Sequence, residues 1–222
     1  MRSKSIYKAL ILDCDGVIVD SEPLSCGAWN LLFQREYQVD VGTNYDAILG
    51  GNTQDSALHY LKKHNLEITE AIIEKLCVLK EQTYLELAKD KLRPIDGVEK
   101  IIEQARLLGW KIGVASSGIL SKITFSLEQV GLQNQFDTIV GMRAGLRGKP
   151  SPDIFLETAS RLLTEPEECI VIEDTPKGIT AGKRAGMFVI GITTTFSKEI
   201  LKNADLIISS FKELNLKTLS NI

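Results

Sequence analysis

Short runs of apolar residues recur along the chain and alternate with longer segments in which apolar residues return every three or four positions. Short apolar runs are typical of strands buried on both faces, and the longer spacing is typical of amphipathic helices. Strands are predicted over residues 8–13, 111–116, 137–141, 169–174, 188–193 and 205–209. Helices are predicted over residues 98–108, 119–130, 152–163 and 177–185. This alternation predicts an α/β fold with a Rossmann-like parallel sheet and helices on both of its faces.

One long segment, residues 21–90, interrupts the alternation, because it contains no convincing strand. Its periodicity predicts helices over residues 24–35, 53–63 and 69–88. The chain then returns to the sheet through K-D-K-L-R-P-I-D-G, where Pro94 and Gly97 break regular structure. We therefore expect two domains: a discontinuous Rossmann-like core of residues 1–20 and 93–222, and an inserted all-helical domain of residues 21–92.

The composition is that of an ordinary globular protein, with 44% hydrophobic and 25% charged residues and a formal net charge of -3. Charges of both signs are interspersed, which argues against a surface for nucleic acid. No apolar run approaches the roughly 20 residues that span a bilayer, and the first residues lack the apolar stretch of a signal peptide. We therefore expect a cytoplasmic protein without a nucleic-acid or membrane partner, and nothing in the sequence requires more than a monomer.

None of the four cysteines belongs to a C-x-x-C pair, and neither histidine accompanies them at zinc-like spacing. We therefore expect structural or incidental thiols. One of them, Cys14, stands between Asp13 and Asp15. Because side chains alternate along an extended chain, Cys14 is expected to point away from the two aspartates into the core.

Polar side chains gather at the ends of three predicted strands and before one helix. Ligands of an open parallel sheet bind outside the carboxyl ends of its strands. Taken singly, such an aspartate often forms a turn, such a serine often caps the next helix, and such a lysine is often solvated. Capping does not explain why acids gather at the ends of two different strands. The candidate site residues are Asp13, Asp15, Ser116, Ser117, Lys149, Glu173 and Asp174.

Several carboxylates at one edge of a sheet need a compensating cation. Two unit charges about 4 Å apart cost about 4 kcal/mol at an effective dielectric of 20, so the acids must bind a cation or protonate. Oxygen ligands suit Mg²⁺, and Lys149 would add a fixed positive charge. Ser116, with a helix N-terminus behind it, would form an anion site. A metal, an anion site and a carboxylate together predict phosphoryl transfer.

The same segments resemble the four motifs of the haloacid dehalogenase (HAD) superfamily, in its branch of β-phosphoglucomutase-like phosphatases. D-C-D-G-V-I-V-D-S-E resembles the first motif, V-A-S-S the second, G-K-P-S-P-D-I-F the third and I-E-D-T-P-K-G-I the fourth. One such motif is only moderately specific, whereas four in order, over essentially the whole chain, are a strong signal. The helical insert is similar to the helical cap of this family.

The resemblance implies a role for each carboxylate. Asp13 would attack phosphorus and form an aspartyl-phosphate. Asp15 would protonate the leaving oxygen and then deprotonate the water that cleaves the intermediate. Mg²⁺ would be held by Asp13, the backbone carbonyl of Asp15 and Asp174, with Glu173 either binding the ion directly or standing behind those ligands.

The resemblance also implies the groups that hold the substrate. Ser116 and Lys149 would bind the transferring phosphoryl oxygens. In the cap, a glycine-containing loop would let the backbone approach the substrate, although a hinge or a helix cap explains the same residues. The predicted substrate-binding residues are Ser117, Gly51, Asn52 and Thr53.

Departures from the motifs separate possible activities. Asp15 favours phosphate esters, because dehalogenases and phosphonoacetaldehyde hydrolases of the superfamily lack an aspartate there. The mutases carry a histidine after the first motif and an arginine in the cap loop, where this chain has Ser25 and Gln54. We therefore expect a Mg²⁺-dependent phosphatase for a small phosphorylated metabolite, a sugar or polyol phosphate. The alternatives are an intramolecular phosphomutase and a non-catalytic phosphate-binding module.

The sequence leaves the roles of three basic residues open. Lys80 matches a cap lysine of the family or is a solvated lysine on a charged helix. Arg143 and Arg147 either favour an anionic substrate or are ordinary surface arginines.

Overall fold

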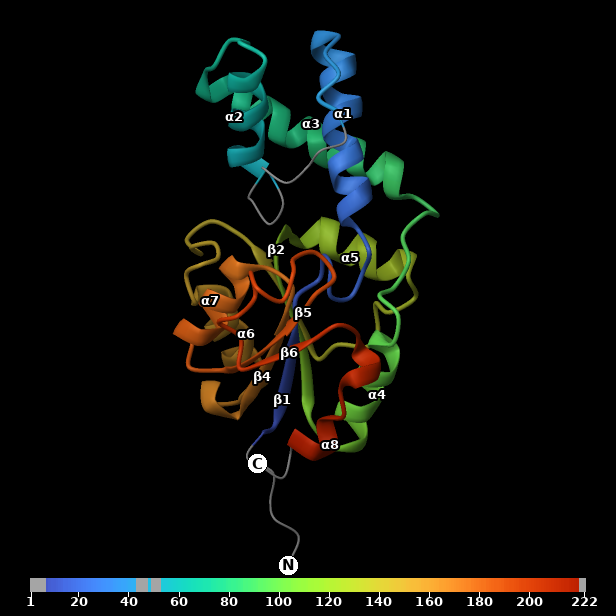
Figure 1. The fold of residues 1–222 in the computed structure, drawn as a ribbon, viewed down its shortest axis with the longest axis vertical. Helices are drawn as coiled ribbons and strands as arrows, with labels where there is room; N and C mark the ends of the chain where they lie inside the picture. The colour runs from blue at the N-terminus through green and yellow to red at the C-terminus, as the bar shows by residue number, and fades with distance from the viewer. Residues whose placement is uncertain (1–6, 43–47, 49–52, 220–222) are drawn as a thin grey trace, which may run out of the picture. The chain divides into compact units, whose positions relative to one another are not determined.

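The computed structural model describes residues 7–42, 48 and 53–219, and the chain divides into two compact units (Figure 1). The larger unit, here called the core, comprises Met1–Asp20 and Arg93–Ile222, and the smaller unit, the cap, comprises Ser21–Leu92. Among the described residues, no helix has both the length and the apolar character needed to cross a membrane.

The core is built on a six-stranded parallel sheet with the strand order β3-β2-β1-β4-β5-β6. The chain forms β1 first, adds β2 and β3 on one side, and then crosses to add β4, β5 and β6 on the other. The order therefore reverses beside β1, where such sheets bind ligands. The strands are β1 (Ala9–Leu12), β2 (Lys111–Ile119), β3 (Thr138–Met142), β4 (Cys169–Glu173), β5 (Phe188–Ile192) and β6 (Leu206–Ile208).

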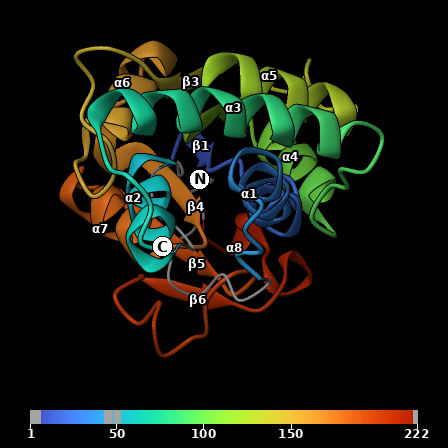
Figure 2. The ribbon, with the colours of Figure 1, turned by 90° about the horizontal axis from the view of Figure 1, so that it is seen from above.

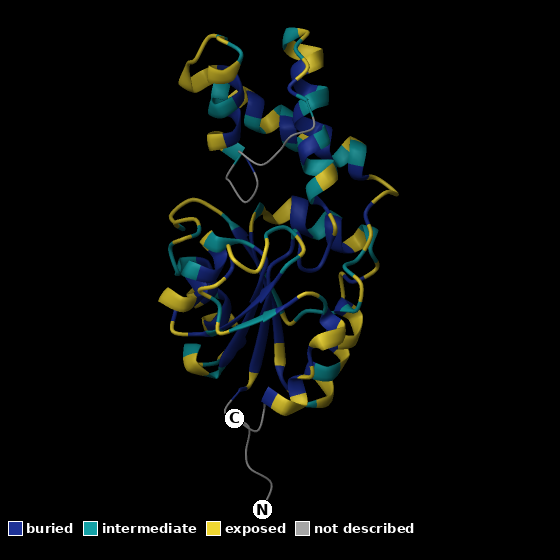
Figure 3. Cartoon of the chain, in the orientation of Figure 1, coloured by how far each residue is buried: buried dark blue, intermediate teal, exposed yellow. Residues whose placement is uncertain are grey.

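Helices cover both faces of the sheet, which confirms the predicted fold class. In Figure 1, α6 and α7 lie on one side of the strands, and α4 and α8 lie on the other. The inner strands β1, β4 and β5 are buried almost throughout (Figure 3), as their apolar composition predicted, whereas the edge strands β3 and β6 are partly exposed. The core helices are α4 (Val98–Leu107), α5 (Leu120–Gln129), α6 (Asp153–Leu162), α7 (Pro176–Arg184) and α8 (Leu216–Leu219), with short 3-10 helices at Pro166–Glu168 and Phe211–Glu213.

The end of β2 differs from the prediction. The strand continues to Ile119, beyond the predicted end at Ser116, and α5 begins at Leu120. Pairing with β3 decides this boundary, because Ile119 lies opposite Met142 after an irregularity in the register. No side chain caps the first turn of α5. The two serines therefore belong to the strand, and helix capping does not account for them.

The cap is all-helical in its described residues and has its own apolar core. Its helices are α1 (Glu22–Tyr37), α2 (Thr53–Lys63) and α3 (Glu70–Ala88). Seen from above in Figure 2, α3 extends across the view while α1 and α2 are seen nearly end-on. Trp29 and Phe33 of α1 pack on Tyr60 of α2 with ring centroids 5.8 and 5.4 Å apart. The side chain of Thr69 caps α3 by accepting a hydrogen bond from the backbone of Ile72 at 3.2 Å.

Candidate active site

Lys149 joins carboxylates from two neighbouring strands. Its Nζ donates hydrogen bonds to Oδ1 of Asp13, which follows β1, and to Oε1 of Glu173 at the end of β4, at 2.6 Å. A third bond, of 3.1 Å, reaches the backbone carbonyl of Ala115 in β2. All three side chains are nearly inaccessible, with 6% of Lys149 and 9% of Asp13 exposed. The structure thus brings three predicted site residues into direct contact.

The charges of this group are strongly coupled. Burial raises the pKa of Asp13 to about 7; Lys149 opposes this, while Glu173 and Asp15 add to it. Burial alone would lower the pKa of Lys149, but its two carboxylate partners outweigh burial and raise it. Lys149 is therefore a permanent cation. Burial and the neighbouring carboxylates therefore favour the protonated form of Asp13, and an added positive charge nearby would favour its ionised form.

Glu173 is fully occupied by hydrogen bonds within the core. Its Oε2 accepts from the backbone N–H groups of Asp174 and Thr175, at 3.0 and 2.9 Å, and from the Thr175 hydroxyl at 3.0 Å. The first turn of α7 packs so closely that a Cβ on Gly178 would lie 1.8 Å from Oε1. Glu173 therefore holds Lys149 and the start of α7, and its oxygens already have partners.

Asp174 is fully buried beside the loop that follows β1. Gly16 in that loop has a φ of +77°, and a Cβ there would lie 2.0 Å from Oδ2 of Asp174. The Thr194 hydroxyl fixes the loop by donating to the Gly16 carbonyl at 2.6 Å. Glycine is thus required at this position both by backbone conformation and by the approach of the carboxylate.

The two predicted serines differ in exposure. Ser116 is buried, and its hydroxyl accepts a hydrogen bond from the backbone N–H of Gly118 at 3.1 Å. It follows Ala115, whose carbonyl binds Lys149. Ser117 is exposed at the same end of β2.

Asp15 has a partner that the sequence interpretation missed. Nζ of Lys122, in the first turn of α5, donates a hydrogen bond of 2.9 Å to Oδ2 of Asp15. In the structure, Lys122 shares the buried face of α5 with Ser126, four residues on, which a lysine and a serine do not indicate from the sequence. Cys14 is buried as expected, and burial raises the pKa of its thiol far above the ordinary value.

Two carboxylates of the described core residues form a donor set that suits a hard cation. No cluster of three or more acidic, histidine or cysteine side chains that could hold a metal occurs within residues 7–42, 48 and 53–219. Asp13 and Asp174 are two buried carboxylates at adjacent strand ends, and Mg²⁺ is often bound by one or two carboxylates together with waters and substrate phosphate. This donor set is compatible with Mg²⁺.

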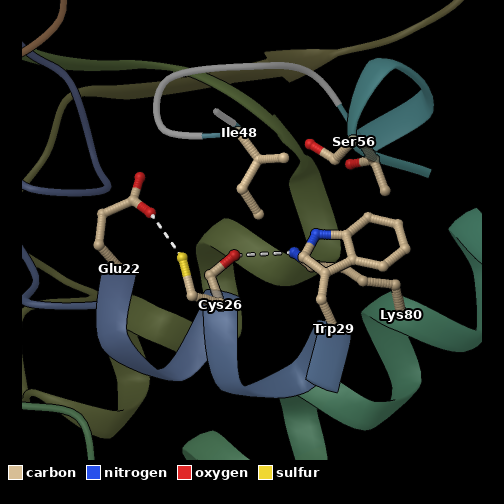
Figure 4. A pocket seen from close by; sticks show the side chains of 8 residues that line it. Glu22, Cys26, Trp29, Ile48, Ser56 and Lys80 are labelled. Atoms are coloured by element: carbon tan, nitrogen blue, oxygen red, sulfur yellow. Dashed lines mark hydrogen bonds between the residues drawn. The ribbon is translucent and has the colours of Figure 1, made fainter. Parts of the chain in front are cut away.

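The cap contains a small polar pocket of its own (Figure 4). Lys80 of α3 donates to the Ser25 hydroxyl of α1 at 2.9 Å, and Cys26 donates to Oε2 of Glu22 at 3.8 Å. Burial and Glu22 raise the pKa of Cys26 to about 12, so this thiol stays protonated. The lining residues are Glu22, Ser25, Cys26, Trp29, Ile48, Thr53, Ser56 and Lys80.

The predicted substrate loop is only partly covered by the structure. Thr53 is the first residue of α2 and lines the cap pocket. Gly51 and Asn52 lie outside the described residues. Gln54, at the position of the mutase arginine, is exposed on α2.

The three basic residues whose roles the sequence left open differ in burial. Lys80 is only 4% exposed, so it is not a solvated lysine. Arg143 and Arg147 have side chains 54% and 78% exposed and pair with acidic residues of α6, Glu157 and Asp153. Both arginines are thus ordinary surface residues in this structure.

Comparison with known proteins agrees with this fold and identifies the family. The family model of haloacid dehalogenase-like hydrolases matches residues 10–192. The chain is 30% identical over 217 residues to the validoxylamine A 7'-phosphate phosphatase of Streptomyces hygroscopicus subsp. limoneus, covering 94% of this chain and 96% of that protein. It is 31% identical over 220 residues to the β-phosphoglucomutase of Bacillus subtilis (strain 168), covering 96% and 93%.

A solved structure gives the same result. The crystal structure of β-phosphoglucomutase from Clostridium difficile matches with a TM-score of 0.84 at 27% identity and covers 97% of each chain. The chain therefore belongs to the haloacid dehalogenase-like hydrolase family, in the branch with a helical cap. The prediction of a phosphoric monoester hydrolase of the HAD type is confirmed at the level of family and enzyme class.

Proposed function

We propose that this protein is a Mg²⁺-dependent phosphatase that hydrolyses a small phosphorylated sugar or polyol through an aspartyl-phosphate on Asp13. The observation that carries the proposal is the contact of Lys149 with both Asp13 and Glu173 at the reversal of strand order. A buried carboxylate beside a fixed cation is a nucleophile next to an anchor for phosphoryl oxygens.

In both steps of the proposed reaction, residues of the core attack phosphorus and exchange the proton. In the first step, an oxygen of Asp13 bonds to phosphorus, the ester P–O bond breaks, and Asp15 gives its proton to the leaving oxygen. In the second step, water attacks phosphorus, Asp15 takes the water proton, and the bond between Asp13 and phosphorus breaks. Lys149 and Ser116 bind the phosphoryl oxygens in both steps.

Mg²⁺ is assigned to Asp13, Asp174 and the backbone carbonyl of Asp15. When bound, the ion would neutralise charge on the phosphoryl oxygens. Glu173 is placed behind these ligands in the proposal, because its oxygens already hold Lys149 and Thr175. Burial raises the pKa of Asp13, and a bound cation would counter this and favour the ionised form that the proposed nucleophile requires.

The cap pocket supplies groups suited to an alcohol rich in hydroxyls. It combines a buried cation, a carboxylate and hydroxyl side chains, with Lys80 and Glu22 as the charged members. Such a donor and acceptor set recognises sugar or polyol hydroxyls better than an apolar leaving group. The full name of the Streptomyces relative, a phosphatase for validoxylamine A 7'-phosphate, supports the same substrate class.

A panel of sugar, polyol and nucleoside monophosphates tests the proposal, with release of inorganic phosphate measured with Mg²⁺ and with a chelator. We expect Mg²⁺-dependent release that is fastest for sugar or polyol phosphates. Absence of release from every ester in the panel would contradict the phosphatase proposal.

The mutase alternative predicts a different product. A hexose 1-phosphate is incubated with a trace of hexose bisphosphate, and the products are separated. We expect free phosphate, because Ser25 and Gln54 replace the histidine and arginine of the mutases. Conversion to the 6-phosphate without free phosphate would favour the mutase.

A further inference from the structure

Lys122 occupies a position that local structure disfavours. It lies in the first turn of α5, where the positive end of the helix dipole favours acidic residues over cations. Its side chain is only 10% exposed, and burying an ammonium group is unfavourable unless a partner compensates its charge. A residue that conflicts with both preferences is expected at a functional site.

The compensating partner is the carboxylate of Asp15, 107 positions earlier in the chain. The Nζ–Oδ2 distance is 2.9 Å, and the side chain of Asp15 is itself 22% exposed. Lys149 binds other carboxylates, those of Asp13 and Glu173. Each buried lysine of this site therefore has its own acidic partners.

The position of Lys122 is fixed by the packing of its helix. Ile123 and Leu127, on the buried face of α5, are both 0% exposed, and α5 packs on β2 and β3. The backbone of Lys122 is therefore held by the core, and its side chain is only 10% exposed. The bond to Oδ2 restricts rotation of the carboxylate of Asp15.

We propose that Lys122 is a positioning residue that holds Asp15 in the orientation required for acid and base catalysis. This assignment rests on the proposed function, in which one carboxylate exchanges protons in both steps. Positioned proton transfer contributes a rate factor of roughly 10²–10⁴, and misplacement of the acid loses part of it. Lys122 acts through Asp15 and is not assigned a contact with substrate.

Two synthetic esters separate this role from a structural one. The leaving group of benzyl phosphate is an alkoxide that needs a proton. The leaving group of p-nitrophenyl phosphate is a stable phenolate that does not. The rate of leaving-group release in a single turnover is measured for wild type, Lys122→Met, Lys122→Arg and a control, Lys100→Met. Lys100 is an exposed lysine of α4, so its variant tests the loss of one positive charge elsewhere on the core.

For Lys122→Met, we expect release from benzyl phosphate to fall roughly 100-fold and release from p-nitrophenyl phosphate to fall less than about fivefold. Lys122→Arg should restore most of the benzyl phosphate rate, and Lys100→Met should match wild type. Equal losses on both esters, or no loss on either, would overturn the assignment while leaving the phosphatase proposal intact. A wild-type protein inactive on both esters and on every sugar and polyol phosphate of the panel would overturn the phosphatase proposal and, with it, the role of Lys122.

Discussion

The core and the cap each bury a lysine, but they surround it differently. Lys149 of the core contacts two carboxylates, those of Asp13 and Glu173, and a backbone carbonyl. Lys80 of the cap bonds the Ser25 hydroxyl, lies 3.5 Å from Glu81 and stands over the ring of Tyr84. The core lysine is fixed between charges, as a group that stabilises a reaction must be. The cap lysine lines a polar pocket, and in the proposed function it would contribute to selection of the substrate.

Replacing Lys149 should reduce both stability and activity more than replacing Lys80. Lys149→Met leaves Asp13 and Glu173 buried without their cation, so we expect a loss of about 3–5 kcal/mol in the free energy of unfolding. Hydrolysis should fall at least about 10³-fold, because the phosphoryl anchor is lost. Urea unfolding and steady-state kinetics measure the two effects.

The control for this variant is Lys8→Met, which removes a solvated lysine paired with Glu168. Its unfolding midpoint and activity should remain those of wild type. A Lys149→Met protein as stable as this control would contradict the assignment of Lys149 as a tightly coupled charge.

Replacing Asp174 by asparagine, a neutral side chain of nearly the same shape, should remove the stabilisation of the protein by Mg²⁺. At a Mg²⁺ concentration about 100 times its Kd, binding stabilises wild type by about 2.7 kcal/mol, which raises the Tm by roughly 5–10 °C. We expect this shift to disappear in Asp174→Asn and to persist in Asp153→Asn, which alters a carboxylate on the surface of α6. Thermal unfolding with and without Mg²⁺ measures this rise in Tm. A rise in Asp174→Asn equal to that of wild type would exclude Asp174 as a ligand of the ion.

The smallest effect on stability is expected from the cap lysine. Lys80→Met leaves the Ser25 hydroxyl and the partly exposed carboxylate of Glu81 behind, rather than two buried carboxylates. The free energy of unfolding should therefore fall by about 1–2 kcal/mol, less than in Lys149→Met. The KM for a sugar phosphate should rise roughly tenfold, whereas that for p-nitrophenyl phosphate should change little. If the kcat of Lys80→Met for both substrates fell as far as that of Lys149→Met, Lys80 would act in the reaction and not in substrate selection, and the proposed difference between the two lysines would be wrong.

Much of the core could be predicted from the sequence, because buried parallel strands are nearly continuous apolar runs and their polar ends stand out. The end of β2 could not, since pairing of Ile119 with Met142 depends on a neighbouring strand. The link between Lys122 and Asp15 joins residues 107 positions apart, and no local pattern specifies that contact. The burial of Lys80 was equally hidden, because α3 carries charge on several sides and only packing against α1 decides which face is covered.

The contact network around Glu173 shows the same limit on a smaller scale. The motif predicted an acid near the metal, but the sequence alone left open whether its oxygens reach the ion. The close approach of Gly178 and the bonds from Thr175 occupy those oxygens, and these follow from how α7 begins.

The most direct test of the central claim compares wild type with Asp13→Asn, a substitution that keeps the shape of the side chain and removes the nucleophilic oxygen. Wild type quenched in acid during turnover should carry one phosphoryl group on the peptide that contains Asp13, as measured by mass spectrometry, and should release phosphate with Mg²⁺. Asp13→Asn should remain folded, carry no phosphoryl group and release no phosphate. Mg²⁺-dependent phosphate release by Asp13→Asn would contradict the account.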